Sequence, residues 1–269
     1  MKPQIKTEAK ISKTDVVCVL LATLSTILLV TALIPPKAQE SEPTLYILHT
    51  PLVPAVIRVK ELARLTEDEN GIDNTWALWL INAYNPLPYG YIPQLSTIGK
   101  SDLDGRVAEY AILMIMAARN DGLILSPVSA YRSVERQAEN FENSFNNERY
   151  LGRSAEDAFY YTIARIAAPY TSEHNAGLAI DFNIAEETFD ATAEFRWLRD
   201  NAHKFGFIMR YPEATSDITG IIYEPWHYRF VGLYHAERIY NWGITLEEYI
   251  GYSAEDDSVF NEFKEQYIA

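Results

Sequence analysis

Hydrophobic residues are most concentrated near the start of the chain, where residues 16–34 form a run of 19 without a charged side chain. A helix of this length spans about 28 Å, close to the hydrocarbon thickness of a bilayer. Residues 1–15 contain four lysines and two acids, so the positive-inside rule places them in the cytoplasm. A cleaved signal peptide is the alternative, but its apolar region is usually about 7–15 residues and ends at small residues. Here Pro35 and Pro36 follow the run directly.

This pattern predicts a transmembrane anchor at 16–34, a polar, proline-containing tether at 35–43 and one domain at 44–269. The anchor would make the protein single-pass in the cell membrane, with a cytoplasmic N-terminus and an extracellular domain. No internal repeat or long linker divides that domain. We therefore expect one folded unit held at the outer face of the membrane.

Several segments of the domain combine apolar residues at helical spacing with capping signals at their ends. The segment 102–119 has an aspartate available as N-cap and a stop signal at 120–122, and its apolar stretch is continuous enough to be largely buried. The expected helices cover 102–119, 133–147, 154–168 and 192–204, and a last one starts at the capping box of Thr245 and Glu248.

Short apolar runs lie between these helices and predict strands. They cover 123–129, 178–182, 207–211 and 221–231, the last interrupted by Pro225. Helices come first and most strands later, with hairpin-like spacing. This order favours an α+β fold, with a small antiparallel sheet flanked by helices, over a doubly wound sheet.

Composition and charge remove several functional classes. The chain has 37 acidic and 23 basic residues and a net charge of −14; residues 1–34 contribute +2, so the remainder has −16. Such a domain lacks the basic surface that a nucleic-acid binder needs. A content of 48% hydrophobic and 13% aromatic residues excludes a disordered chain. The single cysteine, Cys18, lies in the predicted anchor, so the domain has no disulfide framework and no cysteine-based zinc site.

Candidate chemistry is concentrated in two segments. In the first, His174 precedes a turn at 175–177, and a strand pattern follows in which Ala179 and Asp181 share the polar face. The turn can fold His174 back over that face, so that an imidazole and a carboxylate converge. This pair suits a divalent metal of borderline softness such as Zn²⁺.

The second segment supplies another carboxylate and another histidine, Glu224 and His227, three residues apart. A catalytic zinc site uses three protein ligands and an open position for water. Four candidates for three positions leave one carboxylate free, and a carboxylate beside a metal site suits a general base. Spacing alone leaves a surface ion pair open as the plainer interpretation of Glu224.

The two segments together resemble a known family. Ser-x-His-x-x-Gly-x-Ala-x-Asp at 172–181, followed by Glu-Pro-Trp-His at 224–227, is similar to the zinc D-alanyl-D-alanine carboxypeptidases of the VanY type. These belong with the D-Ala-D-Ala dipeptidases and L,D-carboxypeptidases of bacterial cell walls. The resemblance covers 79–232 and includes Asn-Pro-Leu-Pro at 85–88 and Tyr-Arg-Ser at 131–133. It implies the DD-peptidase or hedgehog-like form of the α+β fold.

The resemblance also implies a role for each matching residue. One zinc ion per chain would be bound by His174, Asp181 and His227, and Glu224 would be the general base. Arg132 would orient the substrate carbonyl and stabilise the developing oxyanion. The remaining matches, which would help hold the peptide, are Ser172 and Gln137. The family often has glycine where this chain has Ala130, and alanine fits there unless the position needs a positive φ.

The expected function is hydrolysis of the terminal peptide bond of peptidoglycan stem peptides outside the cell. Three alternatives remain open at this point: an L,D-carboxypeptidase, a peptidoglycan endopeptidase of the same fold, and a zinc-containing cell-wall-binding module without activity. The presence of every ligand and of Glu224 argues against the last.

Overall fold

A computed structural model describes residues 76–252 and 258–268 of the chain. All of them fall in one compact unit, Leu52–Ala269. Within these two ranges, no helix has both the length and the apolar character needed to cross a membrane. The predicted anchor and tether lie outside the described residues and stay predictions.

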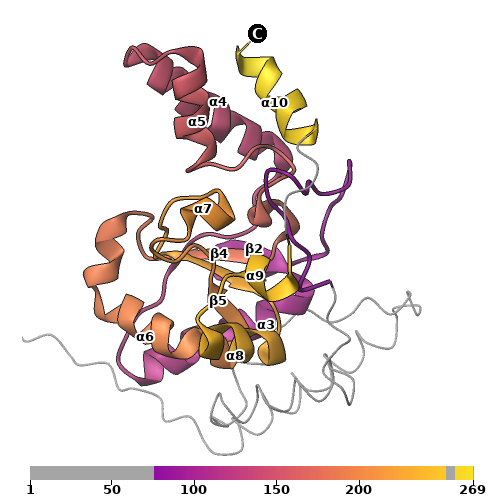
Figure 1. The fold of residues 1–269 in the computed structure, drawn as a ribbon. Coiled ribbons are helices and arrows are strands. Elements are labelled where there is room, and N and C mark those ends of the chain that lie inside the picture. The colour runs from indigo at the N-terminus through magenta and orange to yellow at the C-terminus, as the bar shows by residue number, and fades with distance from the viewer. Residues whose placement is uncertain (1–75, 253–257, 269) are drawn as a thin grey trace, which may run out of the picture. The chain divides into compact units, whose positions relative to one another are not determined.

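The centre of the fold is a four-stranded antiparallel sheet in the order β3-β4-β6-β5. Its strands are β3 (Pro127–Ser129), β4 (Ala179–Phe182), β5 (Phe207–Met209) and β6 (His227–Phe230). A separate antiparallel hairpin joins β1 (Leu95–Ile98) to β2 (Ser101–Asp104). Together with the helices around the sheet (Figure 1), this confirms the expected α+β fold with a small antiparallel sheet.

Helices surround the sheet and make up most of the rest. The α-helices are α3 (Gly105–Asn120), α4 (Val134–Tyr150), α5 (Ala155–Ile163), α6 (Ala193–Asn201), α7 (Ser216–Thr219), α8 (Leu233–Trp242), α9 (Leu246–Ile250) and α10 (Ser258–Ile268). The described residues also form three short 3₁₀ helices, η2 (Glu173–Ala176), η3 (Glu187–Ala191) and η4 (Ala202–Phe205).

The main core forms where α3 packs on the sheet. Asp104 caps α3 by accepting a hydrogen bond from the Arg106 backbone N–H at 2.9 Å, which confirms an aspartate N-cap, although the helix starts at residue 105 and not at the predicted residue 102. Side chains of α3 and of the strands are then buried together, and the ring of Tyr110 lies 4.9 Å from that of Phe230. This core fixes the sheet that bears the candidate ligands.

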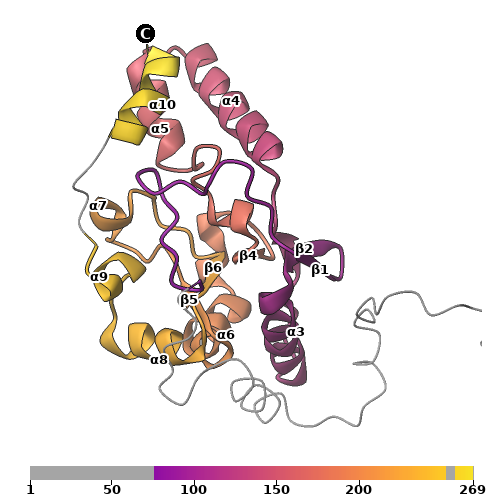
Figure 2. The same ribbon diagram turned by 90° about the vertical axis from the view of Figure 1, so that its right-hand side faces the viewer.

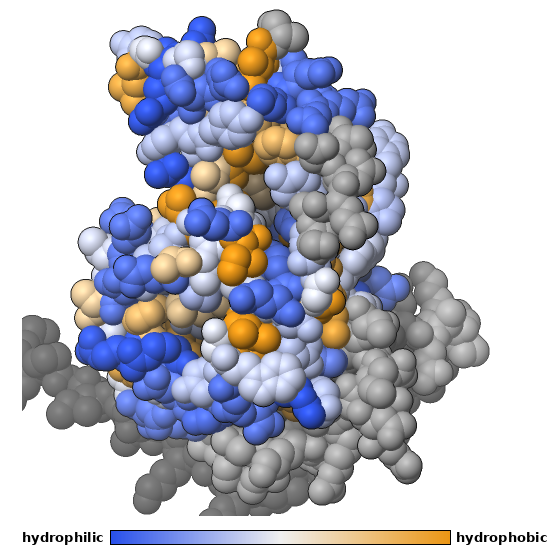
Figure 3. Space-filling model, in the orientation of Figure 1, coloured by the Kyte–Doolittle hydropathy of each residue, from blue (hydrophilic) through white to orange (hydrophobic). Residues whose placement is uncertain are grey.

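A second group of helices, α4, α5 and α10, lies away from the sheet in both ribbon views (Figures 1 and 2). Its core is aromatic: Phe141 of α4 packs on Phe159 of α5 and on Phe263 and Tyr267 of α10, at ring distances of 5.1–6.0 Å. The surface is indented between this group and the sheet-bearing part (Figure 3).

The sequence placed the end of α5 too late, at residue 168. The helix ends at Ile163, and the following carbonyls bond elsewhere: Ala164 O accepts from the Ile222 N–H at 2.9 Å, and Ala167 O accepts from the Gln137 side chain at 2.6 Å. The chain after α5 therefore runs as an irregular segment alongside α4.

Three predicted strands are also shorter than expected, and one of them, β5, ends at Met209 and not at residue 211. In the run 123–129 only β3 is strand, because the Asn183 side chain bonds Ser126 N and Ile124 O in place of a ladder partner. In the run 221–231 only β6 is strand, because a turn at Pro225 separates it from the residues before. The sequence did not predict the β1–β2 hairpin, α8 or α10.

Candidate active site

Two of the predicted metal ligands face each other across the central sheet. β4 and β6 pair so that Asp181 stands directly opposite His227. Residues opposite each other in an antiparallel pair project to the same face, with their Cβ atoms about 5 Å apart. Asp181 Oδ1 accordingly lies 3.1 Å from His227 Nδ1. The strand register alone therefore brings together two of the three predicted metal ligands.

The third predicted ligand, His174, comes from η2 immediately before β4. Gly177 ends η2 in the left-handed region, with φ of 68°, and turns the chain into the strand. The His174 ring then lies with Nε2 3.3 Å from Asp181 Oδ2. Its Nδ1 lies 2.6 Å from the carbonyl oxygen of Ala130, so Nδ1–H donates there and Nε2 is left to bind a metal. Ala130 is not among the residues with positive φ, so alanine fits this position.

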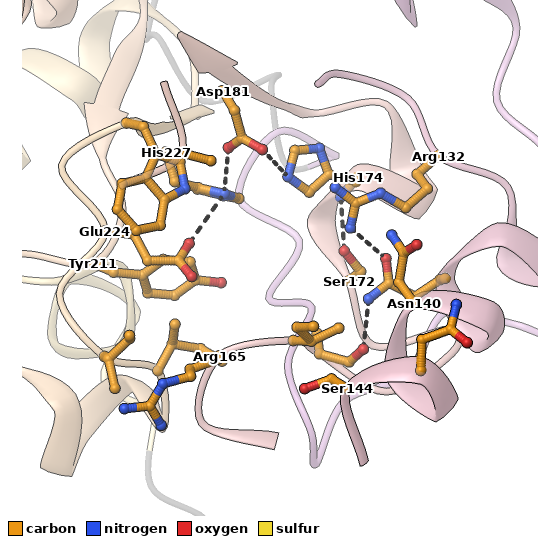
Figure 4. A pocket seen from close by; sticks show the side chains of 18 residues that line it. Arg132, Asn140, Ser144, Arg165, Ser172, His174, Asp181, Tyr211, Glu224 and His227 are labelled. Carbon is orange, nitrogen blue, oxygen red and sulfur yellow. Dashed lines mark hydrogen bonds and ion pairs between the residues drawn. The ribbon is translucent and has the colours of Figure 1, made fainter. Parts of the chain in front are cut away.

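These three side chains fit a zinc ion. One ligand atom from each of His174, Asp181 and His227 lies within 4.8 Å of the others, and all three residues are buried (Figure 4). Asp181 Oδ1 is buried and makes no hydrogen bond within the described residues. Burial lowers the pKa of His174, which favours the neutral imidazole that metals bind. Two imidazoles and one carboxylate are a usual donor set for catalytic zinc.

Behind His227 lies a buried ionic network that the sequence did not reveal. His227 Nε2 lies 3.2 Å from Glu173 Oε2, so the ring donates to Glu173 and presents Nδ1 to the site. Glu173 Oε1 accepts from Arg210 at 2.7 Å and from Arg229 at 2.8 Å, and Arg210 also pairs with both oxygens of Glu247. Burial opposes this carboxylate, but the two guanidinium groups outweigh it and hold the pKa of Glu173 well below its usual range.

Glu224 reaches the site through a tight turn. The His227 N–H donates to the Glu224 carbonyl at 3.1 Å, which closes a four-residue turn with Pro225 at its second position, where proline is favoured. Glu224 Oε2 thereby lies 3.7 Å from His227 Nδ1. Burial raises the pKa of Glu224 to about 8, against the effect of the neighbouring His227. Glu224 and His227 are three residues apart in the sequence because they are the first and last residues of this turn.

Arg132 lies on the other side of the site, next to His174. Its backbone N–H donates to His174 O at 3.0 Å, and its guanidinium donates to Gln137 Oε1 and Ser129 Oγ, both at 2.8 Å. Gln137 is buried and also donates to Ala167 O, so its side chain holds Arg132 and the wall of the pocket. Ser172 caps η2 by accepting from His174 N at 3.3 Å and lines the same pocket.

All seven predicted site residues line or adjoin one pocket of 660 Å³ (Figure 4). Further lining residues come from α4, from the segment after α5 and from 221–222. Trp226 lines it too, and its carbonyl accepts from Phe182 N at 3.1 Å, which holds the turn against β4. The site therefore combines a three-ligand metal centre, one protonatable carboxyl and one cation in a cavity that can hold a peptide end.

Comparison with known proteins agrees with this geometry. Residues 100–233 match the family model "VanY: D-alanyl-D-alanine carboxypeptidase". A D-alanyl-D-alanine carboxypeptidase of Enterococcus faecalis is 37% identical over 186 residues, which cover 69% of this chain and 69% of that protein.

Solved structures give the same result. A variant of the vancomycin resistance D,D-pentapeptidase VanY, in complex with Zn(II), is 38% identical with a TM-score of 0.59, over 65% of this chain and 99% of that one. The L,D-carboxypeptidase LdcB is 34% identical with a TM-score of 0.58, over 67% of this chain and 88% of that one. With its own His174, Asp181 and His227 assembled as in a zinc site, the chain belongs to the VanY family of zinc D-alanyl-D-alanine carboxypeptidases.

Proposed function

We propose that this enzyme removes the terminal D-alanine from peptidoglycan stem peptides that end in D-Ala-D-Ala. The observation that supports this most is the buried set of His174, Asp181 and His227, with Glu224 beside it in a pocket of 660 Å³. Zinc, when bound by these three side chains, supplies a Lewis acid that polarises the scissile carbonyl and acidifies water.

Glu224 is the proton carrier in this proposal. Its carboxyl group accepts the proton of the attacking water on one oxygen and later gives it to the nitrogen of the departing D-alanine. In the metal-free protein, burial favours the protonated form and raises the pKa of Glu224 to about 8, which makes its carboxylate a stronger base toward the proton of the attacking water. A zinc ion nearby favours the carboxylate instead, which prepares the group to accept the proton first.

Arg132 stabilises the charge that develops on the scissile carbonyl oxygen. It is held by Gln137 and Ser129, so its position is fixed before the substrate arrives, and it makes no ion pair with a described carboxylate that would have to break. A fixed cation in a water-poor site contributes several kcal/mol to transition-state stabilisation. Ser172 lines the same pocket and offers a hydroxyl to the peptide.

Replacing Glu224 by glutamine tests the proton carrier. We expect Glu224→Gln to lower kcat by about a hundred- to ten-thousandfold, the usual contribution of a general base, and to leave the zinc content unchanged. D-Alanine release and zinc per chain are measured on the same preparation. Glu213→Gln, an exposed glutamate that does not line this pocket, is the matched control. Turnover that persists in Glu224→Gln contradicts the assignment.

The likeness to LdcB supports one alternative, L,D-carboxypeptidase activity on tetrapeptide stems. Synthetic pentapeptide and tetrapeptide stems offered to the same enzyme, with products identified by mass spectrometry, separate the two. We expect cleavage of the pentapeptide to the tetrapeptide and no further shortening. A tripeptide product would assign the L,D specificity.

We further propose that residues 16–34 anchor the enzyme in the cell membrane, with the catalytic domain outside. The support is the uncharged run and the lysines before it. Protease treatment of intact cells that removes the domain, together with retention of the full chain in the membrane fraction, would support this topology. Release of a shorter chain into the medium would contradict it.

A further inference from the structure

Beyond Gln137, α4 continues as one wall of the catalytic pocket. Asn140, Asn143 and Ser144 lie on α4 and line the pocket. They are spaced three and four residues apart, which places them on one face of the helix. Arg165, from the irregular segment after α5, lines the same pocket. Figure 4 draws Arg165 and Ser144 at the end away from Asp181.

Charge is unevenly divided between the two ends of this pocket. Its two lining carboxylates, Asp181 and Glu224, are both at the metal centre, and so is Arg132. The other lining cation is Arg165. Within the described part of the chain, no carboxylate lines the end that bears Arg165, although the chain as a whole has a net charge of −14. Arg165 is therefore the one charged side chain that lines that end of the pocket among the described residues.

Arg165 is held in place but makes no ion pair with any described residue. Its guanidinium stacks on Tyr161 at 3.7 Å, and one N–H donates to the Tyr161 carbonyl at 3.1 Å. The planar guanidinium keeps further N–H groups for a second partner, and carboxylates match its fork geometry. The neighbouring amides of Asn140 and Asn143 likewise have no hydrogen-bond partner among the described side chains and backbone.

In the proposed function the metal centre fixes where the scissile bond of the peptide lies. The terminal peptide bond must lie at His174, Asp181 and His227, so the acyl part of the substrate has to leave along another wall. A pocket of 660 Å³ is larger than two alanine residues need. The α4 wall and Arg165 lie at the far end, and they offer one cation and several uncharged polar groups.

We infer that Arg165, with Asn140 and Asn143, forms a subsite that binds a free carboxylate on the acyl side of the substrate peptide. This inference rests on the proposed carboxypeptidase function and adds a selectivity to it. A stem peptide that has a free carboxylate before the D-Ala-D-Ala end is then preferred to the same peptide with that group amidated. The preference acts through binding, because Arg165 lies away from the reacting bond.

Three peptides test the subsite: L-Ala-γ-D-Glu-L-Lys-D-Ala-D-Ala with the glutamate α-carboxylate free, the same pentapeptide with that group amidated, and Nα-acetyl-L-Lys-D-Ala-D-Ala. We expect Arg165→Gln to raise KM for the free-carboxylate peptide about two- to fivefold, the range for an ion pair at an exposed side chain such as Arg165. The other two peptides should keep their KM, and kcat should be unchanged for all three. Arg165→Lys should restore part of the loss.

Arg153 supplies the matched control. Its guanidinium lies 4.5 Å from the same Tyr161 ring, but it pairs with Glu148 and does not line the pocket. Arg153→Gln should therefore leave KM unchanged for every peptide. Zinc content and the thermal unfolding midpoint show that each variant is folded.

The outcomes separate the subsite from the function on which it rests. If wild-type enzyme releases D-alanine but treats the free and amidated peptides alike, or if Arg165→Gln affects both equally, the subsite is wrong and the carboxypeptidase stands. If wild-type enzyme releases D-alanine from none of the three peptides, the proposed function fails and the subsite fails with it.

Discussion

Glu173 shows how much of this site depends on a residue that does not touch the metal. It is fully buried between His227, Arg210 and Arg229, and one oxygen serves the imidazole while the other serves both arginines. A carboxylate that accepts the outer N–H of a metal-binding histidine fixes the ring and raises its basicity. The orientation of the His227 ring therefore depends on Glu173, the residue that directly precedes His174 in the sequence.

Glu173→Gln should weaken zinc binding about ten- to a hundredfold, the usual cost of losing such a partner. Glutamine keeps the size but removes the charge that orients His227 and balances two arginines. Competition with a chromophoric chelator measures the affinity. Glu247→Gln is the control, since Glu247 pairs with Arg210 but not with His227. It should lower stability and keep zinc affinity; unchanged affinity in Glu173→Gln would exclude the positioning role.

The sequence identified the ligand residues because their spacing is local. His174 and Asp181 are joined by one turn and one strand, and Glu224 and His227 by one turn. Which carboxylate stays free came from the family resemblance, not from spacing. Glu173 occupies an unspecified position of the Ser-x-His motif and was not predicted to have a role, because burial of a glutamate depends on Arg210 and Arg229, which lie far along the chain and gave no local signal.

At the scale of elements, the junction between η2 and β4 sets the distance between His174 and Asp181. Gly177 occupies it with φ of 68°, and a Cβ there would lie 2.7 Å from the backbone N of Asp104. That nitrogen donates to Gly177 O at 3.0 Å. The junction is therefore pressed against the end of β2, and only glycine fits both the angle and the space.

Gly177→Ala should destabilise the domain and reduce zinc affinity together, because the contact with Asp104 can be relieved only by moving η2 or β4. Gly243→Ala is the matched control, with φ of 64° and nothing within 4 Å of the added Cβ. The control should lower the free energy of unfolding by about 1–2 kcal/mol, the cost of a non-glycine residue in the left-handed region, and should keep its zinc affinity. Equal effects of the two changes on zinc would contradict this account. Chemical unfolding and zinc titration measure both quantities.

Elements were predicted well where their signals are local. The N-caps Asp104, Ser133, Ser154 and Thr192 and the Thr245 capping box are all present. The end of α5 and the lengths of β3 and β6 were wrong because they are decided by partners elsewhere, such as Ile222 and Asn183. The β1–β2 hairpin was not predicted because its strands, with sequences LSTI and SDLD, are largely polar and contain no apolar run.

At the scale of the whole molecule, stability and metal binding both depend on the protonation of Glu224 and His227. In the metal-free protein, burial raises the pKa of Glu224 to about 8, and the carboxylates of Asp181 and Glu173 outweigh burial to raise that of His227 to about 9. Both groups bind a proton more tightly when folded than when unfolded. Their contribution to stability is full below the unfolded pKa and is lost as pH rises through the folded pKa.

The metal-free domain should therefore lose stability as the pH rises from about 4.5 to about 9, because Glu224 (pKa 4.5 unfolded, about 8 folded) and His227 (pKa 6.5 unfolded, about 9 folded) keep their protons over this range only in the folded state. Zinc bound to His227 excludes the proton from Nδ1, so saturating zinc should remove the contribution of His227 to this pH dependence of stability. Thermal unfolding midpoints across this range, with chelator and with zinc, measure the difference. The Glu224→Gln variant should show a smaller loss in chelator. A midpoint that rises with pH in the metal-free protein would contradict the assignment.

The pairing of Asp181 with His227 has a consequence for how the chain folds. Side chains alternate between the faces of a sheet, so a slip of β6 by one residue would turn His227 to the wrong face and present Tyr228 to Asp181. Only the correct pairing binds zinc, and a ligand that binds one state draws population into it. Zinc would then favour the correct register of β4 and β6 during folding. Refolding in zinc should yield fewer slow, misregistered molecules than refolding in chelator.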